Sequence, residues 1–311
     1  MKPHLSALLP YFLSIAETGS LTRAARERAL TQPALSRKMR QLEEGLNVQL
    51  FIRHTRGVEL TAAGRILLRR ARLIEAESRY AIDEIELLKG GATTSVRLTA
   101  GPVWCMSVLP QAIAAVKAAY PQFSAEIEMS GGVGQVEAVA SGEIDMWAGA
   151  LDVNLCRQFD LVHVEPLTVD YQIFAPADHP LQCAHFPPAR LTEHGWVSYS
   201  QDGAWPAMAD LVGRLTGRNA RLAINSTSLM SAMRIAAHGS YLIGLAHPLR
   251  PLAALLNLQP LPHQPLNFSF RSGMCYRPSA VGLPTLSLLI ESLGRFAGEV
   301  TGARPLSKAA S

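Results

Sequence analysis

The chain has 311 residues, of which 48% are apolar and 17% charged, and it carries 29 Lys and Arg against 25 Asp and Glu. At about 100–200 residues per domain, this length predicts two or three domains, each with its own core. The apolar content excludes a chain that is mainly disordered. The four cysteines are too few and too widely spaced for a disulfide scaffold or a zinc site, so we expect no metal site and a location in the reducing cytoplasm. No apolar run reaches the roughly 20 residues of a membrane-spanning helix, so we expect no membrane contact.

The basic residues are concentrated in the first quarter of the chain. Residues 1–72 carry 13 Lys and Arg against 5 Asp and Glu, whereas residues 91–311 carry 14 against 15. Between them, residues 73–90 carry 2 against 5. A small basic module beside a near-neutral remainder is typical of proteins in which one part neutralises nucleic-acid phosphates. An ordinary solvated face is the alternative.

The first 45 residues have the spacing of three helices. Apolar residues recur on one helical face through residues 5–16 and a glycine follows, which favours a capped helix over a secretion signal. Ser20 is a candidate N-cap for a second helix over residues 21–28. After a short turn, Thr31 opens a third helix over residues 32–45, with a proline in its first turn. The pattern predicts a helix-turn-helix.

The predicted third helix has two different faces. Four apolar residues at helical spacing face the core, namely Leu35, Met39, Leu42 and Leu46. The opposite face carries Pro33, Ser36, Arg37 and Arg40. Because a helix fits the major groove, short polar and arginine side chains near its N-terminus can reach base edges. An ordinary solvated helix face is the alternative interpretation.

Residues 48–60 alternate between apolar and polar side chains around a turn that contains a glycine. This pattern predicts a two-stranded wing with Arg53 and Arg56 at its tip. Wing arginines can reach the DNA backbone or the minor groove, although hairpin-tip arginines also serve only solubility.

A long helix is predicted from the capping residue Thr61 to Leu88. Leu67, Ile74 and Ala81 recur every seven residues along it, and Leu88 continues the row. Sustained over about three heptads, this row predicts a coiled-coil seam and a dimer. The alternative is a helix that lies on its own domain.

Residues 12–64 resemble the winged helix-turn-helix of LysR-type transcriptional regulators, in the stretch FLSIAETGSLTRAARERALTQPALSRKMRQLEEGLNVQLFIRHTRGVELTAAG. The chain length, the long helix and the remaining sequence resemble this family too. The resemblance implies an α/β chain with an N-terminal winged helix-turn-helix, a linker helix and a two-subdomain, periplasmic-binding-protein-like effector domain. The implied limits are 1–61 for the DNA-binding domain, 62–91 for the linker and dimerisation helix, 92–303 for the effector-binding domain and 304–311 for the tail. Within the effector domain, subdomain I comprises 92–161 and 266–303, and subdomain II comprises 162–265.

The resemblance also implies partners and DNA-contacting residues. The partners are a double-stranded DNA operator with an inverted repeat, a small-molecule effector, RNA polymerase if the protein is an activator, and further copies of the chain in a homodimer or homotetramer. The DNA-contacting residues implied are Thr22, Thr31, Gln32, Pro33, Ser36, Arg37, Arg40, Arg53 and Arg56.

Two positions depart from the family pattern. Arg28 stands where the family usually has a core leucine, so packing there is expected to use the arginine stem or Leu30. Asn47 replaces a usual glycine, and we expect the turn to survive because asparagine tolerates the left-handed conformation.

From residue 96 the sequence alternates between strands and helices. Strands are expected at SVRLTAG, SAEIEMS and IDMWAGA, with helices at 109–120 and 135–141 between them. This βαβαβ order predicts a mostly parallel sheet. Further strands are expected at VDYQIFAP, GWVSYS, RLAINS, YLIGLA and FSFRSGMCY, with helices at 207–216, 228–238 and 284–300.

Ligands of open α/β sheets bind beyond the carboxyl ends of strands. The effector-binding residues expected there are Gly101, Pro102, Val103, Trp104, Cys105, Ser130, Gly131, Ala150, Tyr199, Ser200, Ser226 and Thr227. Val103 and Trp104 stand where the family often has a hydroxyl, and Ala150 brings no cation, so we expect a comparatively apolar cleft. An organic acid remains a candidate effector through helix N-termini alone.

Enzyme motifs are not recognisable in the chain. We find no nucleophile elbow, phosphate-binding loop or metal-binding helix, and therefore expect no catalytic residues, no cofactor and no enzyme activity. Glu143 and Asp145 precede a strand and are interpreted as turn residues. The alternative function is a small-molecule binding protein or enzyme with a vestigial basic head. The sequence leaves open the effector, the operator, activation or repression, and dimer or tetramer.

Overall fold

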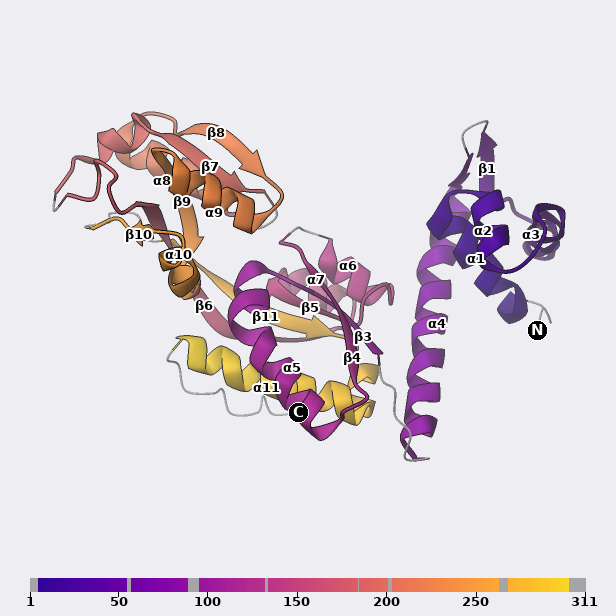
Figure 1. The fold of residues 1–311 in the computed structure, drawn as a ribbon. Helices are drawn as coiled ribbons and strands as arrows, with labels where there is room; N and C mark the ends of the chain where they lie inside the picture. The colour runs from indigo at the N-terminus through magenta and orange to yellow at the C-terminus, as the bar shows by residue number, and fades with distance from the viewer. Residues whose placement is uncertain are drawn as a thin grey trace. The chain divides into compact units, whose positions relative to one another are not determined.

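The computed structural model describes residues 5–54, 57–88, 95–131, 134–183, 185–200, 203–262 and 268–301. It divides into two compact units, which are described separately below (Figure 1). The first comprises Met1–Ile82 with Ser141–Glu143, and the second comprises Asp83–Ala140 with Ile144–Ser311. Arg56 and the predicted tail 304–311 lie outside the described residues.

Three helices form the core of the first unit. They are α1 (Leu5–Thr18), α2 (Leu21–Glu27) and α3 (Gln32–Leu46). The Ser20 hydroxyl accepts a hydrogen bond from the Arg23 N–H at 3.4 Å, and the Thr31 hydroxyl accepts one from the Ala34 N–H at 3.4 Å, so both predicted N-caps are present. The side chains that meet between the helices are almost fully buried: Phe12, Ile15, Leu35, Met39 and Leu42. The predicted helix-turn-helix is confirmed.

The two positions that depart from the family pattern, Arg28 and Asn47, both fit the helix-turn-helix. Arg28 caps the C-terminus of α2 with an exposed side chain, while Leu30 packs against the core, so Leu30 replaces the usual leucine. Helix α3 ends at Leu46, one residue beyond the predicted Gly45, and Asn47 caps it with φ 54°. Its N–H donates to the carbonyls of Glu43 and Glu44. The left-handed turn therefore survives without a glycine, as expected.

A two-stranded wing follows α3. Strands β1 (Phe51–His54) and β2 (Gly57–Leu60) pair antiparallel. The Glu43 carboxylate accepts hydrogen bonds from the N–H groups of Leu50 at 2.8 Å and Phe51 at 3.2 Å. The Phe51 ring packs 5.2 Å from the Phe12 ring. The wing is thus fixed to both α1 and α3.

Helix α4 (Ala62–Leu88) has an N-terminal part that belongs to the first core. The Thr61 hydroxyl caps it, and Leu67 and Ala71 pack with the helix-turn-helix. Farther along, large apolar side chains are about half exposed, namely Ile74 (48%), Ile82 (59%) and Ile85 (52%). The start of the helix therefore lies on its own domain, while its later turns expose apolar side chains and the coiled coil stays a prediction. The side chain of Leu88, the last residue of the predicted row, is not among those that the structure describes.

The second unit is built on a nine-stranded sheet. Its strands are β3 (Ser95–Ala100), β4 (Ser124–Met129), β5 (Met146–Ala150), β6 (Val162–Pro176), β7 (Gly195–Tyr199), β8 (Arg221–Ser226), β9 (Tyr241–Ala246), β10 (Leu258–Pro260) and β11 (Phe268–Tyr276). The order is β4-β3-β5-β11-β6-β9-β7-β8, with β10 on β6. Strands β4, β3 and β5 are parallel to one another, as are β9, β7 and β8. The long strands β6 and β11 run antiparallel between these groups, so the whole sheet is mixed.

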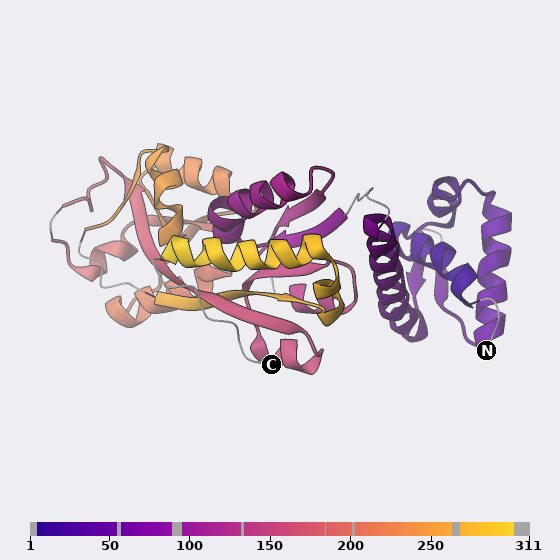
Figure 2. The same ribbon diagram turned by 90° about the horizontal axis from the view of Figure 1, so that it is seen from below.

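The helices of this unit pack on the two strand groups. They are α5 (Leu109–Ala119), α6 (Gln135–Ala140), α7 (Val153–Gln158), α8 (Ala204–Thr216), α9 (Leu229–His238), α10 (Arg250–Ala254) and α11 (Pro284–Thr301), with short turns η1 (Trp104–Val108), η2 (Pro188–Thr192), η3 (His247–Leu249) and η4 (Pro278–Gly282). Figure 2 shows α11 lying along β6 and β11, with α5 beside it. Turn η1 is a π-helical turn, which the sequence pattern did not predict.

A buried ion pair ties β5 to the chain after β11. Arg277 and Asp145, both at most 6% exposed, approach to 3.3 Å. Arg277 also donates to the carbonyls of Val139 at 2.8 Å and Ile144 at 3.0 Å, and Asp145 accepts from the Arg97 N–H at 2.8 Å. Asp145 lies in the bend before β5, as the sequence interpretation has it, and is in addition the buried partner of a distant arginine, which the sequence did not indicate. In the described residues, no helix is both long enough and apolar enough to cross a membrane.

Candidate nucleic-acid interface and ligand hollows

The face of α3 that the sequence predicted to be polar is exposed. Its exposed side chains, including the N-cap, are Thr31, Gln32, Pro33, Arg37 and Arg40. The opposite side is anchored in the core by Leu35, Met39 and Leu42. Because the buried row fixes the rotation of the helix, both arginines point away from the core. The face combines cations with short polar side chains at the N-terminal half of a helix, as major-groove reading requires.

The wing and α3 form one surface through a side-chain contact. The guanidinium of Arg53 on β1 donates to the Ser36 hydroxyl on α3 at 3.2 Å. Ser36 is half-buried, whereas Arg53 is exposed. Ser36 therefore holds a wing cation beside the helix face as well as lying on that face itself. We name the surface formed by Thr31, Gln32, Arg37, Arg40 and Arg53 the α3 face.

Other basic groups lie near this surface. On α2, Thr22 is exposed as predicted, and so are Arg23 and Arg26, which the sequence reasoning did not select. Lys38 places its ammonium 4.5 Å from the centre of the Tyr11 ring. These cations were missed because a single basic residue on an exposed helix carries no signal beyond the net charge of the segment.

In the second unit, a hollow lies at the carboxyl ends of β3 and β5. It has a volume of about 30 Å³, and we name it the tryptophan hollow. Six predicted effector residues line it: Gly101, Pro102, Val103, Trp104, Gly131 and Ala150. Six further lining residues were not predicted: Trp147, Gly149, Val169, Tyr171, Phe270 and Ser272.

The missed residues lie within strands rather than in loops after them. Val169 and Tyr171 alternate on β6, and Phe270 and Ser272 alternate on β11, so each pair shares one face of the sheet. The spacing of two within each pair of residues could be read from the sequence. The sequence did not indicate that β6 pairs with β11, which places both pairs of residues on one wall of the hollow.

Both indole N–H groups of this hollow are occupied within the protein. The Trp104 Nε1 donates to the Ser272 hydroxyl at 2.9 Å, and the Trp147 Nε1 donates to the Ala150 carbonyl at 3.2 Å. The Trp147 ring lies close to Gly149, where an added Cβ would be 2.2 Å from a ring atom. Both tryptophans are almost fully buried, so they are packed into the wall of the hollow.

A second hollow of about 10 Å³ lies on the other strand group, and we name it the Tyr199 hollow. Tyr171 lines both hollows. The other walls include Val197, Ser198, Tyr199, Trp205 and Met208. Tyr199 is the one predicted effector residue among those described as lining this hollow.

The remaining predicted effector residues line neither hollow. Ser200, Ser226 and Thr227 lie at the ends of β7 and β8, where the Ser200 N–H and hydroxyl both donate to the Ser226 carbonyl. Ser130 is buried and accepts from the Gln135 amide. Burial raises the pKa of the Cys105 thiol to about 11, and its Sγ lies 3.4 Å from the Ala100 carbonyl.

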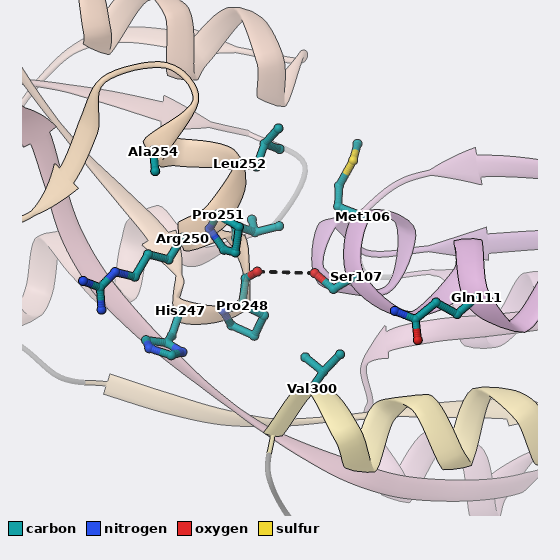
Figure 3. Close-up of a pocket in the computed structure, with 11 residues that line it drawn as sticks. Met106, Ser107, Gln111, His247, Pro248, Arg250, Pro251, Leu252, Ala254 and Val300 are labelled. Atoms are coloured by element: carbon teal, nitrogen blue, oxygen red, sulfur yellow. Dashed lines mark hydrogen bonds between the residues drawn. The ribbon is translucent and has the colours of Figure 1, made fainter.

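A larger groove lies elsewhere in the second unit. It has a volume of about 740 Å³ between η1, α10 and the end of α11, and we name it the α10 groove. Figure 3 shows the Ser107 hydroxyl facing the Pro248 carbonyl, a hydrogen bond of 3.4 Å. In the same view, His247 and Arg250 point away from Gln111. None of the predicted effector residues lines this groove, and the side chains of His247 and Arg250 do not converge with Gln111.

In the described part of the chain, no three His, Cys, Asp or Glu side chains gather in the manner of a metal site. His179 and His194 do pack together, with ring centres 4.5 Å apart, away from both hollows.

Comparison with known families matches both parts of the chain. Residues 7–65 match the family described as "Bacterial regulatory helix-turn-helix protein, lysR family", and residues 89–297 match the "LysR substrate binding domain". The SDS degradation transcriptional activation protein of a Pseudomonas species is 30% identical over 242 residues, which are 75% of this chain and 76% of that protein. Other curated relatives are matched over only 58% and 57% of their own lengths.

Solved structures show the same fold. A full-length OxyR variant from Pseudomonas aeruginosa has a TM-score of 0.65 at 20% identity and covers 98% of both chains. Full-length CbnR in complex with its target DNA has a TM-score of 0.62 at 18% identity and covers 94% of this chain and 99% of that one. At these identities the likeness establishes the architecture of the chain.

Proposed function

The chain belongs to the LysR family of bacterial regulatory proteins, and from this premise we propose that it is a transcription factor that binds operator DNA and responds to a small molecule. The observation that carries the DNA-binding part is the α3 face, where exposed Arg37 and Arg40 lie beside Arg53, held by Ser36. In this proposal α3 enters the major groove, its first residues contact base edges, and the wing contacts the backbone or the minor groove.

We propose that the protein acts as a homodimer or homotetramer on an inverted repeat. The half-exposed isoleucines of α4 supply an apolar surface suited to a second copy of the helix. Two-fold symmetry matches two DNA half-sites and doubles the phosphate contacts. As an activator the protein would also contact RNA polymerase, and access to the chromosome places its action in the cytoplasm.

The functional division proposed along the chain follows from these roles. In this division, residues 1–61 bind DNA, residues 62–91 form the linker and dimerisation helix, and residues 92–303 bind the effector. The effector domain has two subdomains. Subdomain I comprises 92–161 and 266–303, and subdomain II comprises 162–265. Effector binding is proposed at the tryptophan hollow and the Tyr199 hollow, which lie in different strand groups and share Tyr171. A ligand that touches both groups would favour one arrangement of the two groups over others.

The DNA-binding proposal is tested by genomic footprinting of the wild type and of Arg37→Ala. Loss of a side chain that reads a base costs about 1–3 kcal/mol, which is about 5- to 150-fold in affinity. We expect Arg37→Ala to lose footprints at the wild-type sites. Arg218→Ala, which removes an exposed arginine of the second unit, is the matched control and should keep them.

If Arg37→Ala leaves the footprints unchanged, α3 does not read the operator. A wild type without discrete footprints would favour the alternative function, a small-molecule binding protein or enzyme with a vestigial basic head.

A further inference from the structure

We propose that the α10 groove is a further ligand site, which takes an organic anion with an apolar body. The groove has a volume of about 740 Å³, which lies inside the roughly 300–1,000 Å³ that ligand pockets span. The tryptophan hollow and the Tyr199 hollow are far smaller, at about 30 and 10 Å³, and share no lining residue with it. The α10 groove therefore offers room for a small molecule at a separate place.

The ionisable side chains of the groove are basic. Among the described lining residues these are Arg250 and His247, and there is no Asp or Glu. Both side chains are exposed, and neither makes a hydrogen bond or an ion pair with another described residue. A carboxylate can therefore pair with the Arg250 guanidinium, whose planar donors match its geometry, without displacing a protein partner.

The rest of the lining is mainly apolar. It includes Met106, Pro248, Pro251, Leu252, Ala254 and Val300. Figure 3 shows the two prolines between the cationic side chains and Gln111. Leu249 and Ala253 are almost fully buried, so they anchor η3 and α10 and fix the wall that these turns form. A ligand with its anion at Arg250 places its apolar body along the prolines.

The opposite wall contains an unusual turn. Met106, which is 44% exposed, and Ser107 lie on η1, and this turn is π-helical. Such turns are rare in proteins and occur frequently at functional sites. The Ser107 hydroxyl donates to the Pro248 carbonyl at 3.4 Å, so the two walls meet at this point. The turn marks the groove as a site independently of its volume and charge.

The two walls follow different strand groups of the sheet. Turn η1 follows β3, whereas η3 follows β9 and leads into α10. A ligand held between the walls contacts both groups, so its binding favours the arrangement of the groups in which the groove fits it. The site therefore suits a second regulatory molecule, in addition to the effector proposed for the hollows.

The test of the ligand class uses four probes and the full chain. Three share a ring and a carbon chain and differ in the end group: 4-phenylbutanoate, 4-phenylbutan-1-ol and 4-phenylbutylamine. The fourth, acetate, has the anion without the body. Dissociation constants are measured near neutral pH and at low salt by ligand-observed NMR.

We expect 4-phenylbutanoate to bind at least about threefold more tightly than the alcohol or the amine, because it alone gains an opposite charge at an exposed arginine. Acetate should bind at least about tenfold more weakly than 4-phenylbutanoate, because it makes no apolar contacts with the groove.

A charge reversal locates the site. Arg250→Glu places a carboxylate at an exposed position of the groove, and we expect this variant to bind the amine more tightly than the anion. Arg234→Glu is the matched control, because Arg234 is exposed on α9 and does not line the groove. It should keep the wild-type order, and thermal unfolding checks that both variants are folded.

Four results overturn the inference: no binding of 4-phenylbutanoate, equal binding of the alcohol or the amine, equal binding of acetate, or an order of probes that Arg250→Glu does not reverse or that Arg234→Glu reverses as well. The measurements contain no DNA, so the DNA-binding proposal fails separately. A wild type with the expected probe order but no operator footprint would retain this site and lose the transcriptional role.

Discussion

At the scale of single residues, the second unit depends for its stability on keeping both members of the buried ion pair of Arg277 and Asp145. Both side chains are withdrawn from water, and the arginine also serves two carbonyl groups. Removing one member takes away the opposite charge that the other faces in this buried site, which costs about 3–5 kcal/mol. We expect Arg277→Met to lower the free energy of unfolding of the second unit by that amount, measured by denaturant titration.

Arg271→Met, on the strand β11 that precedes Arg277, is the control for this prediction. Arg271 is 71% exposed and pairs with Glu165 at 3.2 Å, so solvent screens the pair and its loss should cost less than about 1 kcal/mol. Equal losses in the two variants would contradict the assigned role of the buried pair.

A second residue-scale prediction concerns the histidine pair. Burial, and next the neighbouring His194, lowers the pKa of His179; burial, and next Arg190, lowers the pKa of His194. The unfolded chain therefore binds more protons than the folded chain just below the ordinary value of 6.5, and stability falls as pH is lowered through this range. His194→Gln should flatten the dependence of the melting temperature on pH, whereas His238→Gln, at an exposed position, should not. A melting temperature independent of pH between 5 and 7 would contradict this prediction.

At the scale of elements, α4 presents an apolar row beyond its own domain. Ile74 is 48% exposed and Ile85 is 52% exposed, and burying such a side chain in a dimer contributes about 1.5–3 kcal/mol. We expect Ile74→Glu to raise the dimer dissociation constant at least about tenfold in sedimentation experiments. Glu75→Gln, at the next and exposed position, should leave it unchanged. An unchanged constant for Ile74→Glu would exclude this part of α4 from the interface.

Elements also show how far the sequence could predict the fold. The helix-turn-helix was predictable because its signals are local: helical periodicity, two N-capping hydroxyls and a left-handed Asn47. Half of the first hollow was predictable too, since Gly101, Trp104 and Ala150 follow or end strands. The pairing of β6 with β11 depends on residues about a hundred positions apart, so no local pattern indicated that Tyr171 and Phe270 share a wall. The buried partner of Asp145 was hidden for the same reason.

At the scale of the whole molecule, operator binding and effector binding must be coupled reciprocally. If a ligand changes the affinity for operator DNA by some factor, DNA changes the affinity for the ligand by the same factor. We expect the effector to bind the free protein and the operator complex with different dissociation constants. The ratio of these constants should equal the ratio of the operator constants measured with and without saturating effector. Unequal ratios, or identical constants in both states, would contradict a ligand-responsive regulator.

The most direct test of the central claim is the affinity of the full chain for a footprinted operator fragment and for a scrambled fragment of equal length, measured over a range of salt concentrations. Sequence-specific regulators prefer their sites by about 10³-fold or more, and phosphate contacts make the affinity fall steeply with salt. We predict both behaviours for the wild type, with Arg37→Ala reducing the preference. Equal affinities for the two fragments, with a shallow dependence on salt, would contradict the account.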